Sequence, residues 1–543
     1  MRKIKLLFIF ILCISFGRIH AQKYAEGVVL VRVKNPYTFE LKRVTDSFNF
    51  DSQIAGFLKS IKTYRIEPLH LAEAIVNDTT GKLEREFVLY ANSTTNLIIE
   101  NLNKTGYFEW VQPNYIYHSF VVPDDDEYGN QWYLDKINMP QAWDIEKGCN
   151  HIRIAVLDAG FHPLKHKDVK NKYFPYRYDA TDLSPTTLYD DDDVSTPDTD
   201  VSDGLAEHGL FVCSVAGAQT DNNKGMAGVG WDIDLVLVRV GYRVDNFSGD
   251  CSYETDDLIR GIDWVVSTTY ARIINLSIGD YTYNQALESC VNYAYHAGCI
   301  FICSSGNISG NTPTEVAFPA RMTNVIAVGA SDQNDNTCSF ECFGPELDLV
   351  APGKDILVAF GKKEYTEKSG TSFSAPIVAG VVALLLSLNP QLSFTQIRDV
   401  LIRTTDRPAG MQNANFTDTY GYGRLDAYKA LKAVKRIAPD VYVYNESPDR
   451  IQIVYAQNRI FSSNYTIHND CKAEFRAGTS IHLQDGFHAG SGSYFHAYID
   501  DVRQPCVSYK IQTENDSAID DSSASDMVDI IKKHGGSIDK FMG

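Results

Sequence analysis

Three side chains that could together activate an alcohol stand at the ends of apolar segments far apart in the chain. Asp158 closes the run AVLD, His208 begins the segment HGLFVCSVAGA, and Ser372 follows Gly-Thr at the start of a long apolar helix. A serine hydroxyl attacks a carbonyl carbon only when a base takes its proton, and the base needs a third group to orient its ring and stabilise its charge. The three residue types therefore predict nucleophilic catalysis.

Each of these residues also has an ordinary structural role when it is taken alone. An Asp after a strand is usually a turn former or a helix cap, and a Ser at a helix start is by default an N-cap. A single His on a helix is more often structural than catalytic. The interpretation therefore depends on the surrounding segments.

Residues 128–437 supply the elements that must position these side chains. They contain five short, almost wholly apolar runs, each ending near Gly or Asn: IRIAVLDAG, IDLVLVRVG, ARIINLSIG, CIFICSSGN and NVIAVGAS. Such runs are typical of strands covered on both faces in a parallel sheet, and helical segments lie between them. The sequence predicts an α/β domain with a doubly wound parallel sheet, whose functional residues gather at the carboxyl ends of the strands.

The segments around the three residues resemble those of the subtilisin-like serine peptidases, whose catalytic residues occur in the order Asp, His, Ser. IAVLDAG resembles the Asp block of that family, HGLFVCSVAGA its His block and GTSFSAPIVAG its Ser block. Further blocks, among them DNNKGMAGVG, VAFPARMTNVIAVGAS and LDLVAPGKDI, follow in the family's order over about 300 residues. The resemblance implies a serine endopeptidase that needs no cofactor for its chemistry, with Ser372 as nucleophile, His208 as base and Asp158 orienting His208.

The resemblance also implies which residues hold the substrate. Asn307, which follows a strand and a glycine, would donate to the oxyanion together with the backbone N–H of Ser372. Pro376 is expected in the first turn of the Ser372 helix, where its missing N–H would be unpaired anyway. Two segments would bind the substrate main chain as an added strand. Their residues are Ser277, Ile278 and Gly279, and Ser304, Ser305 and Gly306.

Departures from the family pattern lie beside the acid and the base. Leu210 and Phe211 stand where Thr and His are usual, and Ala159 where Ser or Thr is common. None removes a proton-transfer partner, so altered packing is expected rather than lost activity. Because of these departures, an alternative stays open, namely a catalytically silent binding or adhesion protein that keeps the peptidase scaffold. A lipase or esterase is disfavoured, because its Ser would precede the acid and the base.

The net charge of −19 argues against a nucleic-acid surface and suits calcium, whose ligands are oxygens. Structural calcium therefore stays open, although the sequence assigns no metal ligands. The acidic segment 189–204, YDDDDVSTPDTDVSDG, is either a solvated loop or a place for calcium or basic substrates. Ile308, which follows Asn307, has no carboxylate that could bind a basic substrate side chain. The sequence therefore predicts a broad or apolar preference for the substrate residue before the scissile bond.

Residues 1–21 predict an export signal, with a basic head and an apolar run too short to span a bilayer. A secreted or cell-envelope location without a transmembrane segment is expected. Ten cysteines remain after Cys13, so disulfides are expected in the oxidising compartment. Cys338 and Cys342 are a candidate pair with other connectivities left open, whereas Cys213 and Cys303 are expected to be buried thiols.

The flanking segments predict further domains. Residues 22–118 alternate strands and a helix as a small α+β unit and resemble the family's inhibitory propeptides, so this unit would be a partner of the active site. By the same resemblance, self-cleavage would fall in the stretch 117–128, which contains the linker 119–127. Residues 441–506 are β-rich and resemble a module at the C-terminal ends of some secreted or cell-envelope bacterial proteins. This resemblance implies a structural or surface-attachment role. Residues 507–543 form an acidic tail after the module. Four histidines of the module fit no standard zinc spacing and are expected on strand surfaces; they are His468, His482, His488 and His496.

Overall fold

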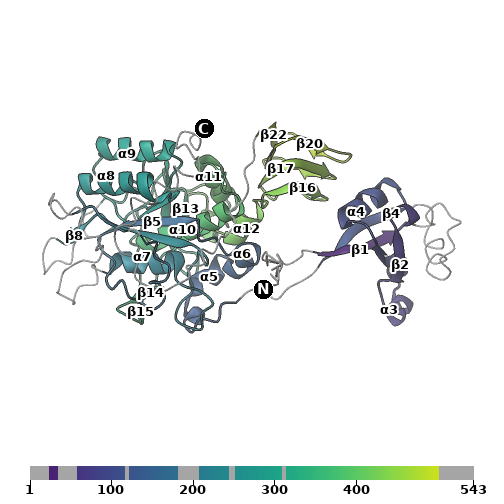
Figure 1. The fold of residues 1–543 in the computed structure, drawn as a ribbon, viewed down its shortest axis with the longest axis horizontal. Helices are drawn as coiled ribbons and strands as arrows, with labels where there is room; N and C mark the ends of the chain where they lie inside the picture. Colours follow the sequence, from purple (N-terminus) through teal and green to yellow (C-terminus); the bar gives the residue numbers. More distant parts are fainter. Residues whose placement is uncertain are drawn as a thin grey trace, which may run out of the picture. The chain divides into compact units, whose positions relative to one another are not determined.

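The computed structural model describes residues 24–34, 58–115, 122–175, 177–181, 207–243, 251–308 and 313–500. The predicted export signal, the acidic segment 189–204 and the acidic tail lie outside these ranges. The chain divides into two compact units, Met1–Val122 and Pro123–Gly543 (Figure 1).

The N-terminal unit is an antiparallel sheet with helix α4 (Thr95–Lys104) against β1 and β4. Its strands follow the order β2-β3-β1-β4. They are β1 (Tyr24–Val33), β2 (Thr63–Pro68), β3 (Glu86–Ala91) and β4 (Phe108–Tyr115), with the short helix α3 (Ala72–Asn77) after β2. Val29, Val31 and Leu89 of the sheet and Ile98 of α4 are fully buried, so the apolar alternation of the strands forms one core. This is the α+β unit that the sequence predicts.

The second unit is built on a seven-stranded sheet in which every pair of neighbouring strands is parallel. The strand order is β13-β12-β11-β10-β5-β7-β6. The five predicted apolar runs are β5 (Arg153–Asp158), β7 (Asp234–Arg239), β10 (Ile273–Leu276), β11 (Ile300–Ser304) and β12 (Val325–Ser331); the edge strands are β6 (Tyr178–Asp179) and β13 (Leu349–Pro352). The predicted doubly wound α/β fold is confirmed.

Helices cover both faces of this sheet. Figure 1 shows α8 (Thr255–Trp264) and α9 (Gln285–His296) on one face, and α7 (His208–Gly217) and α10 (Thr371–Leu388) on the other. Every residue of α10 is buried, because the helix packs against the sheet, α7 and α12. Among the described residues, α10 is the one helix that is long and apolar enough to cross a bilayer, and its complete burial identifies it as a core helix.

Shorter elements complete the second unit around this core. A hairpin of β14 (Ile356–Phe360) and β15 (Glu364–Lys368) leads into α10, and two further β strands pair as β8 (Tyr242–Arg243) and β9 (Cys251–Ser252). The remaining helices are α5 (Trp132–Lys136), α6 (Met139–Ile145), α11 (Phe394–Arg403) and α12 (Ala427–Lys432). The hairpin therefore sets where α10 begins.

The β-rich segment after α12 is a parallel solenoid. Lys472 pairs with Ile451 and Tyr494 pairs with Lys472, so each coil stacks on the previous one after about 21 residues. Its strands are β16 (Ala438–Tyr444), β17 (Ile451–Ser463), β18 (Thr466–Ile467), β19 (Lys472–Ala477), β20 (Ser480–Leu483), β21 (His488–Ala489) and β22 (Tyr494–Ile499). The four histidines noted in the sequence are exposed on this solenoid.

The solenoid is joined to the rest of the second unit through β17 and β19. The backbone N–H of Ile453 donates to the carbonyl of Ala433 at 2.8 Å, and the carbonyl of Ile453 accepts from the N–H of Lys435 at 2.9 Å. Lys472 and Asp399 of α11 form an ion pair at 2.7 Å. The β-rich segment therefore continues the second unit rather than hanging from a free linker.

Candidate active site

The predicted acid and base meet at the carboxyl end of β5. Asp158 is the last residue of β5 and is fully buried, and His208 is the first residue of α7. The Nδ1 atom of His208 lies 2.8 Å and 2.9 Å from the two carboxylate oxygens of Asp158. The backbone N–H of Ala159 donates to Asp158 Oδ1 at 2.7 Å, which fixes the carboxylate plane.

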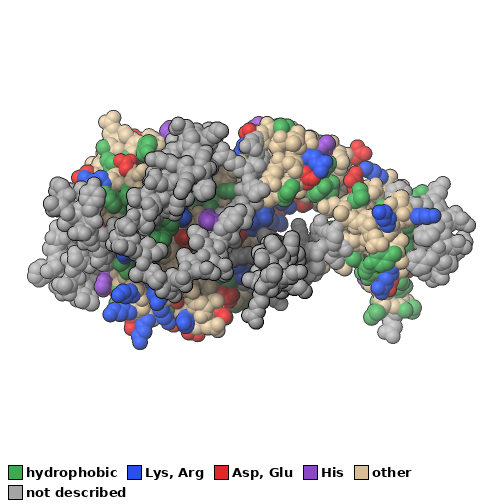
Figure 2. Space-filling view, in the orientation of Figure 1, with side chains coloured by type: hydrophobic (Ala, Val, Ile, Leu, Met, Phe, Trp, Pro, Cys, Tyr) green, Lys and Arg blue, Asp and Glu red, His purple; other side chains and the backbone are tan. Residues whose placement is uncertain are grey.

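The charge of Asp158 sets the protonation behaviour of His208. Burial lowers the pKa of the imidazole, but the negative charge and the hydrogen bond of Asp158 raise this pKa by more, and the net shift is upward. Lys368, at the end of β15, opposes Asp158 and lowers the same pKa. Figure 2 shows Lys and Arg side chains gathered over the β14–β15 hairpin that carries Lys368.

Ser372 is the second residue of α10, and its side chain is almost buried, with 8% of the residue exposed. The rings of His208 and Phe373 have centroids 6.0 Å apart, so the start of α10 lies next to the base. Ser372 Oγ donates to the carbonyl of Ser277 at 3.2 Å. Within the described part of the chain, no hydrogen bond joins this hydroxyl to His208. Proton transfer therefore requires the hydroxyl to exchange the carbonyl of Ser277 for His208 as its acceptor.

Pro376 lies in the second turn of α10, so the prediction of a first-turn proline is wrong. A residue at this position normally donates its N–H to the carbonyl four residues earlier, which is that of Ser372, and proline has no N–H to give. Ser277 Oγ donates to that carbonyl instead, at 2.8 Å, and is itself held by Asn275 Nδ2 at 3.0 Å. The proline thus frees a carbonyl that ties Ser372 to the end of β10.

Asn307 lies beside the start of α10 with its amide orientation fixed. Its Oδ1 accepts from the backbone N–H and the hydroxyl of Thr371, at 3.0 Å and 3.1 Å. A Cβ atom built on Gly370 would lie 3.5 Å from Asn307 Nδ2 and 3.8 Å from its Oδ1, so the amide lies beside that glycine. The N–H of Ser372 is among the first N–H groups of α10, which have no acceptor within their own helix. The amide of Asn307 is thus held at the same helix start, through the neighbouring Thr371.

The six predicted substrate-binding residues follow two adjacent strands. Leu276 of β10 pairs with Cys303 of β11, so the segments 277–279 and 304–306 continue from neighbouring strand ends. The backbone of Ala317 donates to the carbonyl of Ser305 at 2.8 Å, and Asp280 and Phe318 exchange two backbone hydrogen bonds. The side chains of Ser277, Ser304 and Ser305 are buried. Only backbone groups of these serines are thus suited to hold a substrate.

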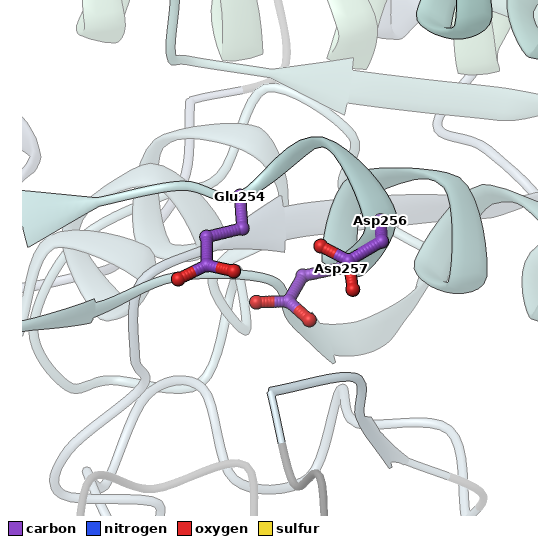
Figure 3. A group of neighbouring side chains, drawn as sticks. All are labelled: Glu254, Asp256 and Asp257. Atoms are coloured by element: carbon purple, nitrogen blue, oxygen red, sulfur yellow. The ribbon is translucent and has the colours of Figure 1, made fainter.

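A cavity of about 580 Å³ adjoins these segments. Its apolar lining comes from Leu258, Leu276, Ile278, Leu287 and Phe318, and Glu254 and Asp280 also line it. Next to the cavity, the carboxylates of Glu254, Asp256 and Asp257 lie within 4.8 Å of one another (Figure 3).

Arg260 partly balances this acidic group, with ion pairs at 2.5 Å to Asp257 and at 3.0 Å to Asp256. Burial raises the pKa of Asp257, Arg260 lowers it, and the nearby Asp256 and Glu254 raise it again. Arg260 therefore balances two of the three carboxylates, those of Asp256 and Asp257.

A second oxygen-rich group, which the sequence analysis did not assign, lies between the start of the second unit and the loop after α7. Asp125 Oδ2 accepts from the N–H of Asp221, and Asp168 Oδ2 accepts from Tyr365 at 2.6 Å and from the N–H of Met226 at 2.8 Å. Burial raises the pKa of Asp125 to about 6, and the nearby negative charges contribute to this rise.

Two oxygens of this group, Asp168 Oδ1 and Asn222 Oδ1, are buried without a hydrogen-bond partner. Such oxygens are costly unless a donor or a cation satisfies them. The donor set, carboxylates and an amide oxygen, is the one that a hard cation such as Ca²⁺ prefers. The signal in the sequence was the Asp and Asn content of DDDEYG and DNNKG.

The predicted Cys338–Cys342 disulfide is wrong, since both residues are buried free thiols. The sulfur of Cys342 contacts the hydroxyl of Tyr281 at 3.1 Å instead. Cys213 and Cys303 are buried free thiols, as predicted. Cys149 is disulfide-bonded.

Residues 150–423 match the model of the subtilase family, Peptidase_S8. The chain is 33% identical over 352 residues to the thermophilic serine proteinase of Bacillus sp. (strain AK1), covering 64% of this chain and 79% of that protein. It is 34% identical over 313 residues to thermitase of Thermoactinomyces vulgaris, covering 57% and 99%. A solved protease structure from Pseudoalteromonas arctica is 26% identical, with a TM-score of 0.50, and the match covers 58% of this chain and 99% of that one.

Proposed function

Since this chain belongs to the subtilase family and is a serine-type endopeptidase, we propose that Asp158, His208 and Ser372 are its catalytic triad. The observation that carries the proposal is the hydrogen bond between the fully buried Asp158 and the partly buried His208, next to the start of α10. Leu210 and Phe211, which motivated a catalytically silent scaffold, are core residues of α7 and leave this pair intact.

In the proposed reaction, His208 Nε2 takes the proton of Ser372 Oγ as this oxygen attacks the carbonyl carbon of the scissile peptide bond. Asp158 holds the proton on His208 Nδ1, so that Nε2 is the free acceptor, and stabilises the imidazolium that forms. His208 then gives the proton to the leaving nitrogen as the C–N bond breaks, and an acyl-enzyme on Ser372 remains. Water, deprotonated by His208, hydrolyses this ester and restores the hydroxyl.

The negative charge that develops on the carbonyl oxygen would be bound by Asn307 Nδ2 and the N–H of Ser372. The orientation of the Asn307 amide by Thr371 supports this role, because the donor is fixed before the substrate arrives. The positive end of the α10 dipole acts on the same oxygen. Such preorganised donors stabilise the transition state more than the neutral carbonyl.

The substrate main chain would add as a strand to residues 277–279 and 304–306, and the adjoining cavity would take one of its side chains. The substrates are proteins or peptides. The N-terminal α+β unit would be the enzyme's own propeptide, removed by self-cleavage near the linker 119–127, and the leader 1–21 would direct export of the proenzyme. These assignments rest on the resemblance of those segments to leaders and propeptides.

We further propose a structural calcium ion held by Asp125, Asp168 and Asn222. The two buried oxygens without partners, Asp168 Oδ1 and Asn222 Oδ1, support the choice of a cation at this position. The ion would stabilise the loop after α7 against the start of the second unit. It takes no part in the proposed reaction.

The triad is tested by labelling with a fluorophosphonate, which reacts with an activated serine. The variant Ser372→Ala should bind no label and hydrolyse no peptide, while its thermal unfolding stays like that of the parent. The matched control is Ser374→Ala in the same helix turn, whose hydroxyl donates to the carbonyls of Ala351 and Pro352 and does not face the base. This control should keep the label. A label retained by Ser372→Ala would refute the assignment.

A further inference from the structure

A short segment after β12 runs alongside the residues that present Asn307. Asn307 and Glu341 form an antiparallel β-bridge. On either side of this bridge, the N–H of Ile308 donates to the carbonyl of Phe340 at 2.6 Å, and the N–H of Cys342 donates to the carbonyl of Gly306 at 3.2 Å. The backbone around Asn307 is therefore held from both sides by residues 340–342.

The side chain of Glu341 anchors this segment to the sheet. Only 2% of the residue is exposed, and its Oε1 accepts from the N–H of Ala330 in β12 at 3.0 Å. The missing side chain of Gly329 makes room for it, since a Cβ atom at that position would lie 1.9 Å from Glu341 Oε1. The glycine and the carboxyl group thus fit each other within the core.

This carboxyl group has no ion-pair partner among the described residues. Burial raises its pKa well above the ordinary value, and hydrogen bonds with the backbone of Ala330 and Cys338 lower this pKa by less. The titratable groups that interact with it are the thiols of Cys338 and Cys342 on its own segment and the phenol of Tyr420. None of these groups carries a positive charge, so Glu341 does not form an ion pair with them.

We propose that Glu341 is a positioning residue for Asn307. Its side chain fixes residues 340–342 to β12, and this segment holds the backbone from which the Asn307 amide is presented to the oxyanion. The inference rests on the proposed role of Asn307 and extends it by one residue, which touches neither the substrate nor the triad. It accounts for a buried acid that the reaction itself does not use.

A double-mutant cycle on kcat and KM separates positioning from general stability. Asn307→Ala should lower kcat by about 10²–10³. Glu341→Ala should lower kcat by about tenfold or more with KM nearly unchanged, because a small displacement of Asn307 weakens a bond made in the transition state. The double variant should be about as active as Asn307→Ala, since Glu341 acts only through Asn307. Glu341→Gln keeps an acceptor for the N–H of Ala330 and should restore most of kcat.

If the double variant loses kcat by the product of the two single losses, the residues act independently and the positioning role is overturned. A Glu341→Gln variant with a kcat as low as that of Glu341→Ala would also overturn it. If Glu341→Ala does not fold, Gly329→Ala replaces it, because the added Cβ must displace the Glu341 carboxyl group and should lower kcat in the same way. An unchanged kcat in folded Gly329→Ala would refute the inference. An Asn307→Ala variant of full activity would instead refute the proposed oxyanion role itself.

Discussion

Replacing Asp158 by Asn tests whether the buried carboxylate sets the tautomer of His208. Asp158 Oδ1 accepts from the N–H of Ala159 at 2.7 Å, and this backbone donor remains in the variant. The amide oxygen of the new side chain should therefore stay in the Oδ1 position, which puts the amide nitrogen in the Oδ2 position, 2.9 Å from His208 Nδ1. The amide nitrogen can donate to Nδ1 once this atom is unprotonated, and the amide oxygen, 2.8 Å from Nδ1, carries no negative charge to hold a proton there. The variant should therefore shift His208 toward the tautomer with its proton on Nε2.

With its proton on Nε2, His208 cannot take the proton of Ser372. We expect kcat to fall by about 10⁴, or about 5.5 kcal/mol of lost transition-state stabilisation. The pH dependence should also change, because activity is lost as pH falls through the pKa of His208. Asp158 raises that pKa, whereas burial and Lys368 lower it. The acid limb of the residual activity should therefore move to lower pH.

The assay is hydrolysis of a chromogenic peptide between about pH 5 and about pH 9, with thermal unfolding as the check on folding. The matched control is Asp179→Asn, which removes the ion pair with Arg239 on the neighbouring strands β6 and β7 without contacting His208. It should keep the parent's kcat and acid limb. A folded Asp158→Asn variant within about tenfold of the parent kcat would refute the tautomer argument.

Two further predictions concern groups around the site. Lys368→Met should raise the pKa of His208, because it removes a positive charge that lowers this pKa, and the acid limb of kcat/KM should therefore move to higher pH. The control Lys368→Arg keeps the charge and should leave the acid limb in place. The shift should shrink as salt is added, and a salt-independent shift or a shift to lower pH would contradict the prediction. In the inactive Ser372→Ala background, Ca²⁺ at about 100 times its Kd should stabilise the fold by about 2.7 kcal/mol, measured by thermal unfolding against a chelator. Asp168→Asn should lose most of this gain, and equal unfolding temperatures with Ca²⁺ and chelator would refute the calcium site.

The parallel sheet could be predicted because of how its strands are buried. Strands covered on both faces have no solvent side, so β5, β10 and β11 appear in the sequence as unbroken apolar runs rather than as alternating patterns. The polar residues that follow such runs gather at one edge of the sheet. This reasoning placed Asp158 and the predicted substrate-binding segments at the carboxyl ends of β5, β10 and β11, where the structure has them.

Features that depend on side-chain direction or on distant partners were not predictable in this way. The spacing of Cys338 and Cys342 permits a short loop, but the sulfur of Cys342 contacts Tyr281, which the spacing cannot reveal. The oxygens of Asp125, Asp168 and Asn222 come from three separate segments, none with a metal-binding spacing of its own. In the solenoid, alternation predicted strands, whereas parallel stacking appears only when residues about 21 positions apart are compared.

Pro376 shows why the local environment of the nucleophile needed the whole fold. Considered within its own helix, this proline only removes a hydrogen bond to the carbonyl of Ser372. In the folded chain, Ser277 Oγ donates to that carbonyl, and the backbone carbonyl of Ser277 accepts from Ser372 Oγ. Ser277, the first residue of the predicted substrate-binding strand, and the proposed nucleophile Ser372 are thereby joined by two hydrogen bonds. The helix defect is thus the condition for this link, and it can be recognised only when β10 and α10 are packed together.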